Sequence, residues 1–317
     1  MPHRKVVNVS ERSAEKNAIQ PSTLYLVATP IGNLDDMTFR ALKVLKEATL
    51  VAAEDTRNTI KLLTHFGIKP AKLISCFEHN EVKRTDEILT ALSEGGSVAL
   101  VTDAGMPGIS DPGFQVVKAV VEKGFAVVPV PGASALLAAL PASGFPATPF
   151  TFAGFLPPKT GDRQKALLQL KTQEHTLVFF ESPHRLMNSL KDMMNVFGNR
   201  QGVVGRELTK LHEEFVRGNL QELWKHFKTV EPKGEFVVMV EGAEHVDRSL
   251  QEKWVGVSIA DQLVQLMKEQ SLSKTEAVKA VCKLRDLPRE VVYQIATQIK
   301  WEEMGLGESM DQDEGLD

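Results

Sequence analysis

The residues of this 317-residue chain that are best suited to bind a ligand lie in a loop rich in glycine and proline, DAGMPGISDPG, residues 103–113. Its glycines, Gly105, Gly108 and Gly113, fit neither the G-x-G-x-x-G of a dinucleotide-binding fold nor the G-x-x-x-x-G-K-[ST] of a phosphate loop. Glycine admits positive φ and proline fixes its own φ, so such a loop lets main chain approach a ligand closely. The loop has no lysine for a phosphate, and its Asp103 indicates a cationic or hydroxyl-bearing ligand.

A second group of motifs supplies donors, acceptors and positive charge of the kind that binds phosphates and ribose hydroxyls. These motifs are EDTR at 54–57, EHN at 78–80, ESPHR at 181–185 and RELTK at 206–210. Structural roles remain open for some of them. Asp55 with Arg57 suits an internal ion pair, and Pro183 with His184 suits the start of a helix.

No metal centre or disulfide is expected. His212 and Glu213 are adjacent but have no third ligand near them in the sequence. Cys76 and Cys282 are isolated from each other and from any paired histidine, which is typical of reduced, structural thiols.

Composition and charge limit the class of protein. The chain is 43% hydrophobic and 25% charged, which excludes disorder throughout. Residues 301–317 contain seven acids and no base, so the other 300 residues carry +3 although the net charge is −4. A local cationic face for nucleic acid is therefore possible. No apolar run approaches the roughly 20 residues of a membrane span, and the N-terminus lacks the apolar core of a signal peptide, so we expect a cytoplasmic protein without membrane contact.

The secondary structure that must position these motifs alternates along the chain. Runs rich in β-forming residues are followed by segments whose apolar residues repeat with the period of a helix. In the first half we expect strands at 23–28, 49–53, 72–77, 97–102 and 125–130. A helix over 36–48 would place Met37, Ala41, Leu45 and Ala48 on one face. This alternation predicts an α/β fold with a mostly parallel sheet.

The second half has a different pattern, because only some of the segments between consecutive expected strands are long enough to contain a helix. We expect strands at 148–155, 175–181, 201–207, 212–219 and 234–242, with helices near 162–172 and 184–196. A second, mixed sheet is predicted. Three short helices at 258–270, 273–284 and 288–299 follow, and Ser273 with Glu276 forms a capping box at the second.

The predicted domains are a disordered leader (1–22), two α/β domains (23–131 and 132–245), a small C-terminal helical domain (250–300) and a disordered acidic tail (301–317). The unusual motifs follow the carboxyl ends of the expected strands, where α/β sheets bind their ligands. We therefore expect one cleft between the two α/β domains.

Seven motifs in sequence order resemble the ribosomal RNA small subunit methyltransferase I family of the tetrapyrrole-methylase superfamily. They are TPIGNLDDMTFRAL, EDTR, DAGMPGISDPG, PGASALLAALPASGF, GFLPPK, ESPHR and RELTK, within about residues 23–245. The resemblance implies a class III methyltransferase fold with a cofactor cleft, and S-adenosylmethionine-dependent methylation of a cytidine 2′-hydroxyl in the decoding centre of 16S rRNA. It also implies a homodimer that acts on the assembled small subunit. Met106 departs from the family, whose loop usually has threonine there.

The resemblance also assigns roles to residues of this chain. The expected cofactor contacts are Pro30, Ile31, Asp103, Ala104, Gly105, Met106, Pro107, Ser134, Ala135, Phe180, Leu208 and Phe236. The expected RNA contacts are Arg57, His79, Asn80, Arg185, Arg206 and Lys210. The candidates for a base or electrostatic helper are Asp55, Glu181, His184 and Glu207. Two alternatives remain, a methylase of a tetrapyrrole or other small molecule on the same fold, and a ribosome-assembly factor without catalytic activity.

Overall fold

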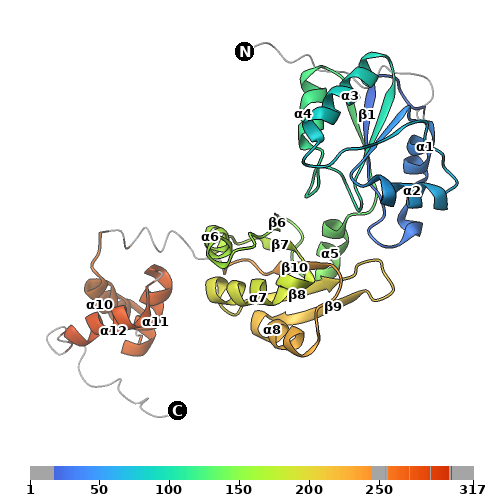
Figure 1. Ribbon diagram of the computed structural model, residues 1–317. Helices are drawn as coiled ribbons and strands as arrows, with labels where there is room; N and C mark the ends of the chain where they lie inside the picture. Colours follow the sequence, from blue (N-terminus) through green and yellow to red (C-terminus); the bar gives the residue numbers. More distant parts are fainter. Residues whose placement is uncertain are drawn as a thin grey trace. The chain divides into compact units, whose positions relative to one another are not determined.

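The computed structural model describes residues 18–244, 254, 256–270, 272–285, 287–299 and 301 (Figure 1). These residues form two compact units, one that ends at Ala243 and one that begins at Glu244. Most of the expected leader (1–17) and nearly all of the acidic tail (302–317) lie outside the described residues.

The first sheet is entirely parallel, as the sequence predicts, and has the strand order β3-β2-β4-β1-β5. Its strands are β1 (Thr23–Val27), β2 (Leu50–Ala53), β3 (Leu73–Ser75), β4 (Ser97–Val101) and β5 (Ala126–Val130). Because strand side chains alternate between faces, Tyr25 and Val27 enter one core while Leu24 enters the other.

Helices cover both faces of this sheet. One core receives α1 (Phe39–Glu47) and α2 (Thr56–His65), and the other receives α3 (Glu81–Ser93) and α4 (Phe114–Glu122) (Figure 1). The helix predicted over 36–48 is shorter, and its four predicted face residues, Met37, Ala41, Leu45 and Ala48, are all buried. Ala41 and Leu45 lie in α1, whereas Met37 and Ala48 flank it in extended conformation.

Residues 18–22 belong to this folded unit rather than to a disordered leader. Ile19 packs against the core beneath α1 and α2. The Gln20 amide donates a hydrogen bond to the Tyr25 hydroxyl oxygen at 2.8 Å, and the Ser22 amide donates to the Gly95 carbonyl at 3.4 Å. The segment gains apolar burial and backbone partners that its polar sequence does not reveal.

The second sheet is mixed, also as predicted, with the order β6-β7-β10-β8-β9. Only the β6–β7 pair is parallel. The strands are β6 (Phe150–Phe155), β7 (Thr176–Glu181), β8 (Gln201–Arg206), β9 (Glu214–Asn219) and β10 (Phe236–Val240). One face packs against α6 (Thr160–Leu170), α7 (Pro183–Phe197) and α8 (Leu220–Thr229).

The other face of the second sheet packs against α5 (Ala135–Ser143), which directly follows the first sheet in the chain. The Ser134 hydroxyl caps its first turn by accepting from the Leu137 amide at 3.4 Å, and Gly144 ends it with φ of 87°. α5 was not predicted from the sequence, because its alanines and leucines lie on both sides of the helix and Pro141 lies inside it. A short 3₁₀ turn, η2 (Leu34–Asp36), follows β1.

The described part of the C-terminal unit contains α10 (Ile259–Gln270), α11 (Lys274–Arg285) and α12 (Arg289–Gln298), close to the three predicted helices. The capping box is confirmed, since the Ser273 amide donates to Glu276 Oε2 at 2.9 Å and the Glu276 amide donates to Ser273 Oγ at 3.3 Å. None of the helices in the described part of the chain has the length and apolar character needed to cross a membrane.

Candidate active site

The loops that follow β1 and β4 are joined by a two-way backbone bridge at the carboxyl edge of the first sheet. The Thr29 amide donates to the Gly105 carbonyl at 2.9 Å, and the Gly105 amide donates to the Thr29 carbonyl at 3.0 Å. Gly105 has φ of +81°, a conformation that glycine adopts without strain. A cavity lies on each side of this pair of loops.

The first cavity has a volume of about 330 Å³ and lies between the ends of the two sheets. Nine of the twelve predicted cofactor residues line it, namely Ile31, Ala104, Gly105, Met106, Ser134, Ala135, Phe180, Leu208 and Phe236. Of the other three, Pro30 and Asp103 line the second cavity, and Pro107 lines neither. The structure thus brings most of these residues together although they are more than 200 positions apart.

Three acidic residues contribute to the lining of the first cavity, Asp111, Glu181 and Glu235, and no lysine, arginine or histidine does so among the described residues that surround it. Asp111 lies within the DAGMPGISDPG motif but was not singled out from the sequence. Burial, together with the nearby carboxylates of Glu54 and Asp103, raises the pKa of Asp111 to about 6. Glu181 and Glu235 have cationic partners outside the lining, Arg185 and Lys210, so Asp111, once ionised, is the acid that suits the cavity to a cationic ligand.

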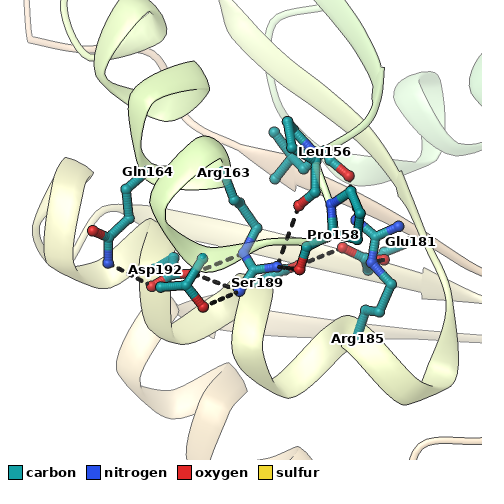
Figure 2. A network of polar contacts seen from close by, with 10 residues as sticks. Leu156, Pro158, Arg163, Gln164, Glu181, Arg185, Ser189 and Asp192 are labelled. Atoms are coloured by element: carbon teal, nitrogen blue, oxygen red, sulfur yellow. Dashed lines mark hydrogen bonds and ion pairs between the residues drawn. The ribbon is translucent and has the colours of Figure 1, made fainter.

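Glu181 is a buried carboxylate whose oxygens are already engaged (Figure 2). Oε1 accepts from the Ser182 amide at 2.9 Å and lies 3.5 Å from the Arg185 guanidinium, while Oε2 accepts from the Ser189 hydroxyl. Arg185 also donates to the Leu156 carbonyl. The Arg185 side chain thus points into the second domain. This orientation does not support the prediction that Arg185 contacts RNA.

A buried ion pair continues this network deeper into the second domain (Figure 2). Arg163 donates to Asp192 Oδ2 at 2.7 Å, and both side chains are almost fully buried. Arg163 also donates to the carbonyls of Pro157 and Pro158 at 3.3 and 2.9 Å. Since Phe155, just before those prolines, lines the first cavity, the pair holds a loop that shapes the cavity wall.

The loop between β8 and β9 reaches from the second domain to the loop after β1. The Thr209 hydroxyl accepts from the Asn33 amide at 3.1 Å. Lys210 lies over Gly32, where an added Cβ would approach its Cγ to 2.3 Å. Lys210 Nζ forms ion pairs with Glu207 at 2.9 Å and Glu235 at 2.8 Å. These two predicted site residues, Glu207 and Lys210, therefore neutralise each other at the rim of the site.

Asp55 and Arg57 form the ion pair that the sequence left open. Asp55 caps α2 by accepting from the Arg57 amide at 2.8 Å, and its Oδ2 lies 2.7 Å from Arg57 Nη2. Hydrogen bonds from Arg57 lower the pKa of Asp55 to about 2, which makes Asp55 a poor proton acceptor at neutral pH. The guanidinium of Arg57 remains exposed to solvent.

The remaining predicted residues do not line either cavity. His184 is exposed in the first turn of α7. Arg206 pairs with Glu214 at 2.7 Å. His79 is exposed, and Asn80 precedes α3, where its Oδ1 accepts from the Phe77 amide. The polar motifs are thus spread around the site, and several of them stabilise loops.

The second cavity, of about 400 Å³, lies between α2 and the loop after β1. Its polar lining includes Asn58, Lys61, His65, Thr102 and Asp103. Asn58 directly follows the EDTR motif, and nothing in the sequence marks Lys61 or His65 as site residues.

Comparisons with known proteins identify the family. The family model for tetrapyrrole (corrin/porphyrin) methylases matches residues 23–224. The chain is 47% identical to the ribosomal RNA small subunit methyltransferase I of Halalkalibacterium halodurans over 278 residues, which cover 87% of this chain and 95% of the relative. It is 48% identical to the protein of that name from Thermotoga maritima over 221 residues, which cover 70% of this chain and 99% of the relative.

A solved structure supports the fold. Cobalt precorrin-4 methyltransferase, CbiF, superposes with a TM-score of 0.51 at 20% identity and covers 69% of this chain and 95% of its own. At that identity the likeness concerns architecture alone. The sequence relatives and the family model carry the assignment further: the chain belongs to the ribosomal RNA small subunit methyltransferase I family, within the tetrapyrrole methylases.

Proposed function

We propose that this protein transfers a methyl group from S-adenosylmethionine to the 2′-hydroxyl of a cytidine in the 16S rRNA of the small ribosomal subunit. The observation that carries the proposal is the first cavity, at the strand ends of a chain with relatives named ribosomal RNA small subunit methyltransferase I. The alternative of an assembly factor without activity is disfavoured by a cavity that retains most of the expected cofactor residues.

The lining of the first cavity fits S-adenosylmethionine, which carries a sulfonium, an amino acid and an adenosine but no phosphate. Asp111, which forms no ion pair with the described residues, suits the positive charge when it is ionised. Phe155 and Phe180, whose ring centroids lie 5.6 Å apart, offer aromatic surface to the adenine or the sulfonium. Gly105 lets main chain approach the ligand.

When bound, the cofactor supplies an electrophilic methyl group. The chain's own contribution is to position the ribose hydroxyl within about 3 to 3.5 Å of that carbon, in line with the bond that breaks. The bridge between Thr29 and Gly105 fixes the two loops that separate the cavities, and the contact between Thr209 and Asn33 holds the second domain against them. Glu181, held by Ser182 and Ser189, has a fixed orientation at the cavity wall.

We expect cofactor discrimination to depend on pH through Asp111. Its carboxyl, with a pKa of about 6, is neutral below that pH and negative above it. S-adenosylmethionine has a sulfonium charge that its demethylated product lacks. From about pH 5 to about pH 7.5 the affinity ratio should therefore shift toward S-adenosylmethionine by about 5-fold. Calorimetry with both ligands measures the ratio, and Asp111→Asn should make it independent of pH. A wild-type ratio that stays constant would contradict this role.

The reaction itself is tested with purified protein, radiolabelled S-adenosylmethionine and small subunits that lack the modification. We expect label in 16S rRNA at a cytidine ribose, found as an alkali-resistant linkage, and little label in free RNA, because the body carries only +3 and few phosphate contacts give modest affinity. Methylation of a tetrapyrrole without label in the subunit would refute the proposal.

The protein is further proposed to act as a homodimer in the cytoplasm, where its ribosomal substrate resides. Large apolar side chains are exposed on the first unit, among them Phe39, Leu137 and Leu211, and a second copy could cover such side chains. Sedimentation velocity tests the assembly. A monomer at micromolar concentration with full activity would contradict it.

A further inference from the structure

The second cavity has no role in the cofactor binding proposed above, yet it adjoins the first. Pro30 and Asp103 line the second cavity, and the next residues, Ile31 and Ala104, line the first. The two cavities are therefore lined by neighbouring residues of the same two loops. A substrate that extends along these loops from the second cavity therefore comes next to the first cavity.

The second cavity presents a hydrogen-bond acceptor in a fixed orientation. Asp103 Oδ2 accepts from the Asn58 side-chain amide at 2.8 Å, and Asp103 Oδ1 accepts from the Asp55 amide at 3.3 Å. An ionised carboxylate has about four acceptor positions, so two such bonds orient it and leave positions for a ligand. No cation pairs with Asp103 among the described residues, so the acceptor remains available.

A second polar group in this cavity lacks a partner within the protein. Thr102 is 3% exposed, and its hydroxyl Oγ1 forms no hydrogen bond with any described residue. A buried hydroxyl without a partner costs free energy, and a ligand that supplies the bond removes this cost. Thr102 lies next to Asp103, so both can serve one polar edge of a ligand.

The remaining walls suit a flat ring attached to an anionic backbone. Pro30, Leu34 and Leu62 supply apolar surface for a ring face. Lys61 forms no ion pair with the part of the chain that the structure describes, and its charge suits a phosphate. A volume of about 400 Å³ is ample for a nucleoside.

We propose that the second cavity receives the cytosine base of the target nucleotide, with Asp103 accepting a hydrogen bond from the exocyclic amine. This inference rests on the proposed function and specifies how its substrate is chosen. A carboxylate accepts from the amine of cytosine, whereas uracil presents a carbonyl oxygen at that position, which the carboxylate repels. Thr102 Oγ1 donates to a ring acceptor of the same edge. The ribose then lies at the two loops, beside the methyl group in the first cavity. Asp103 is in this account a residue of base recognition and not of cofactor binding.

The test compares small subunits reconstituted with cytidine or uridine at the methylated position, at saturating cofactor. The wild-type protein should prefer cytidine by about 10- to 100-fold in kcat/KM. Asp103→Asn should bring this preference within about 3-fold, because a carboxamide can donate to the uracil carbonyl. Asp86→Asn, the same change at an exposed residue of α3 outside both cavities, should keep the wild-type preference.

A second variant covers the case in which Asp103→Asn does not fold. Thr102→Val removes a hydroxyl that has no partner in the described protein, so it should unfold at the wild-type temperature or above. Its kcat/KM on cytidine subunits should fall about 5-fold or more, with cofactor affinity unchanged by calorimetry.

An unchanged preference in a folded Asp103→Asn protein, or a loss of cofactor affinity in either variant, would overturn the inference while the methyl transfer stands. Absence of methylation by the wild-type protein on both subunits would instead refute the proposed function. The two failures are therefore distinguishable.

Discussion

Gly105→Val is expected to weaken S-adenosylmethionine binding by about 100-fold or more and to abolish methyl transfer. A Cβ at this position would lie 3.6 Å from Ile31 Cγ2 and 3.9 Å from the Ala133 carbonyl, so the methyl groups of valine would extend into the first cavity. The positive φ adds backbone strain for a β-branched residue. Calorimetry with the purified variant measures the affinity.

Gly108→Val separates the effect of lost space in the cavity from the effect of backbone strain. Gly108 has φ of +80°, almost equal to that of Gly105, but it lines neither cavity and an added Cβ would meet no atom within 4 Å. Both variants should therefore lose similar stability, about 1 to 2 kcal/mol, and only Gly105→Val should lose the cofactor. Equal losses of affinity would show that loop conformation, rather than space in the cavity, limits binding.

Asp192→Ala is expected to lower the free energy of unfolding by about 3 to 5 kcal/mol. The change leaves the guanidinium of Arg163 buried without its counter-charge and removes an acceptor of the Gln164 amide at 2.8 Å. Urea denaturation followed by circular dichroism measures the loss. Because Arg163 also anchors the loop at Pro157 and Pro158, we expect the cofactor to bind more weakly as well.

An exposed ion pair in α6, the helix that contains Arg163, provides the control. Asp162 lies 3.9 Å from Lys165, and both side chains are largely in solvent. Asp162→Ala should therefore change stability by no more than about 0.5 kcal/mol. A combined Arg163→Met and Asp192→Leu replacement should recover most of the lost stability, since no charge then remains buried. Equal effects of Asp192→Ala and Asp162→Ala would contradict the importance of burial.

The sheets could be predicted from the sequence because their strands carry local signals. Runs such as SVALVT and FVVMV are rich in β-branched residues and end at glycine or charged motifs, and all ten expected strands are present. α5 could not be predicted, because its apolar residues face both the sheet and solvent and give no helical period. α8 was also missed, although Asn219 and Glu222 form a capping box there.

The candidate site could be predicted in part, for a related reason. Glycine and proline motifs indicate where main chain lines a cavity, and they predicted most of the expected cofactor residues that line the first cavity. These motifs do not indicate in which direction a side chain points. Asp103 and Ala104 are neighbours in one motif but face different cavities, and Arg185 points into a buried network although its motif looks like a cationic surface. Such directions depend on tertiary packing.

The backbone bridge between Thr29 and Gly105 also has a thermodynamic consequence, because the two loops that it joins line both cavities. A ligand that shifts these loops from one side changes the free energy of binding on the other. Equilibrium linkage requires the effect to be reciprocal, so any factor by which the cofactor raises RNA affinity is the factor by which RNA raises cofactor affinity. Affinities measured for either ligand alone therefore do not describe the ternary complex, whose stability includes this coupling free energy in addition to the two separate binding free energies.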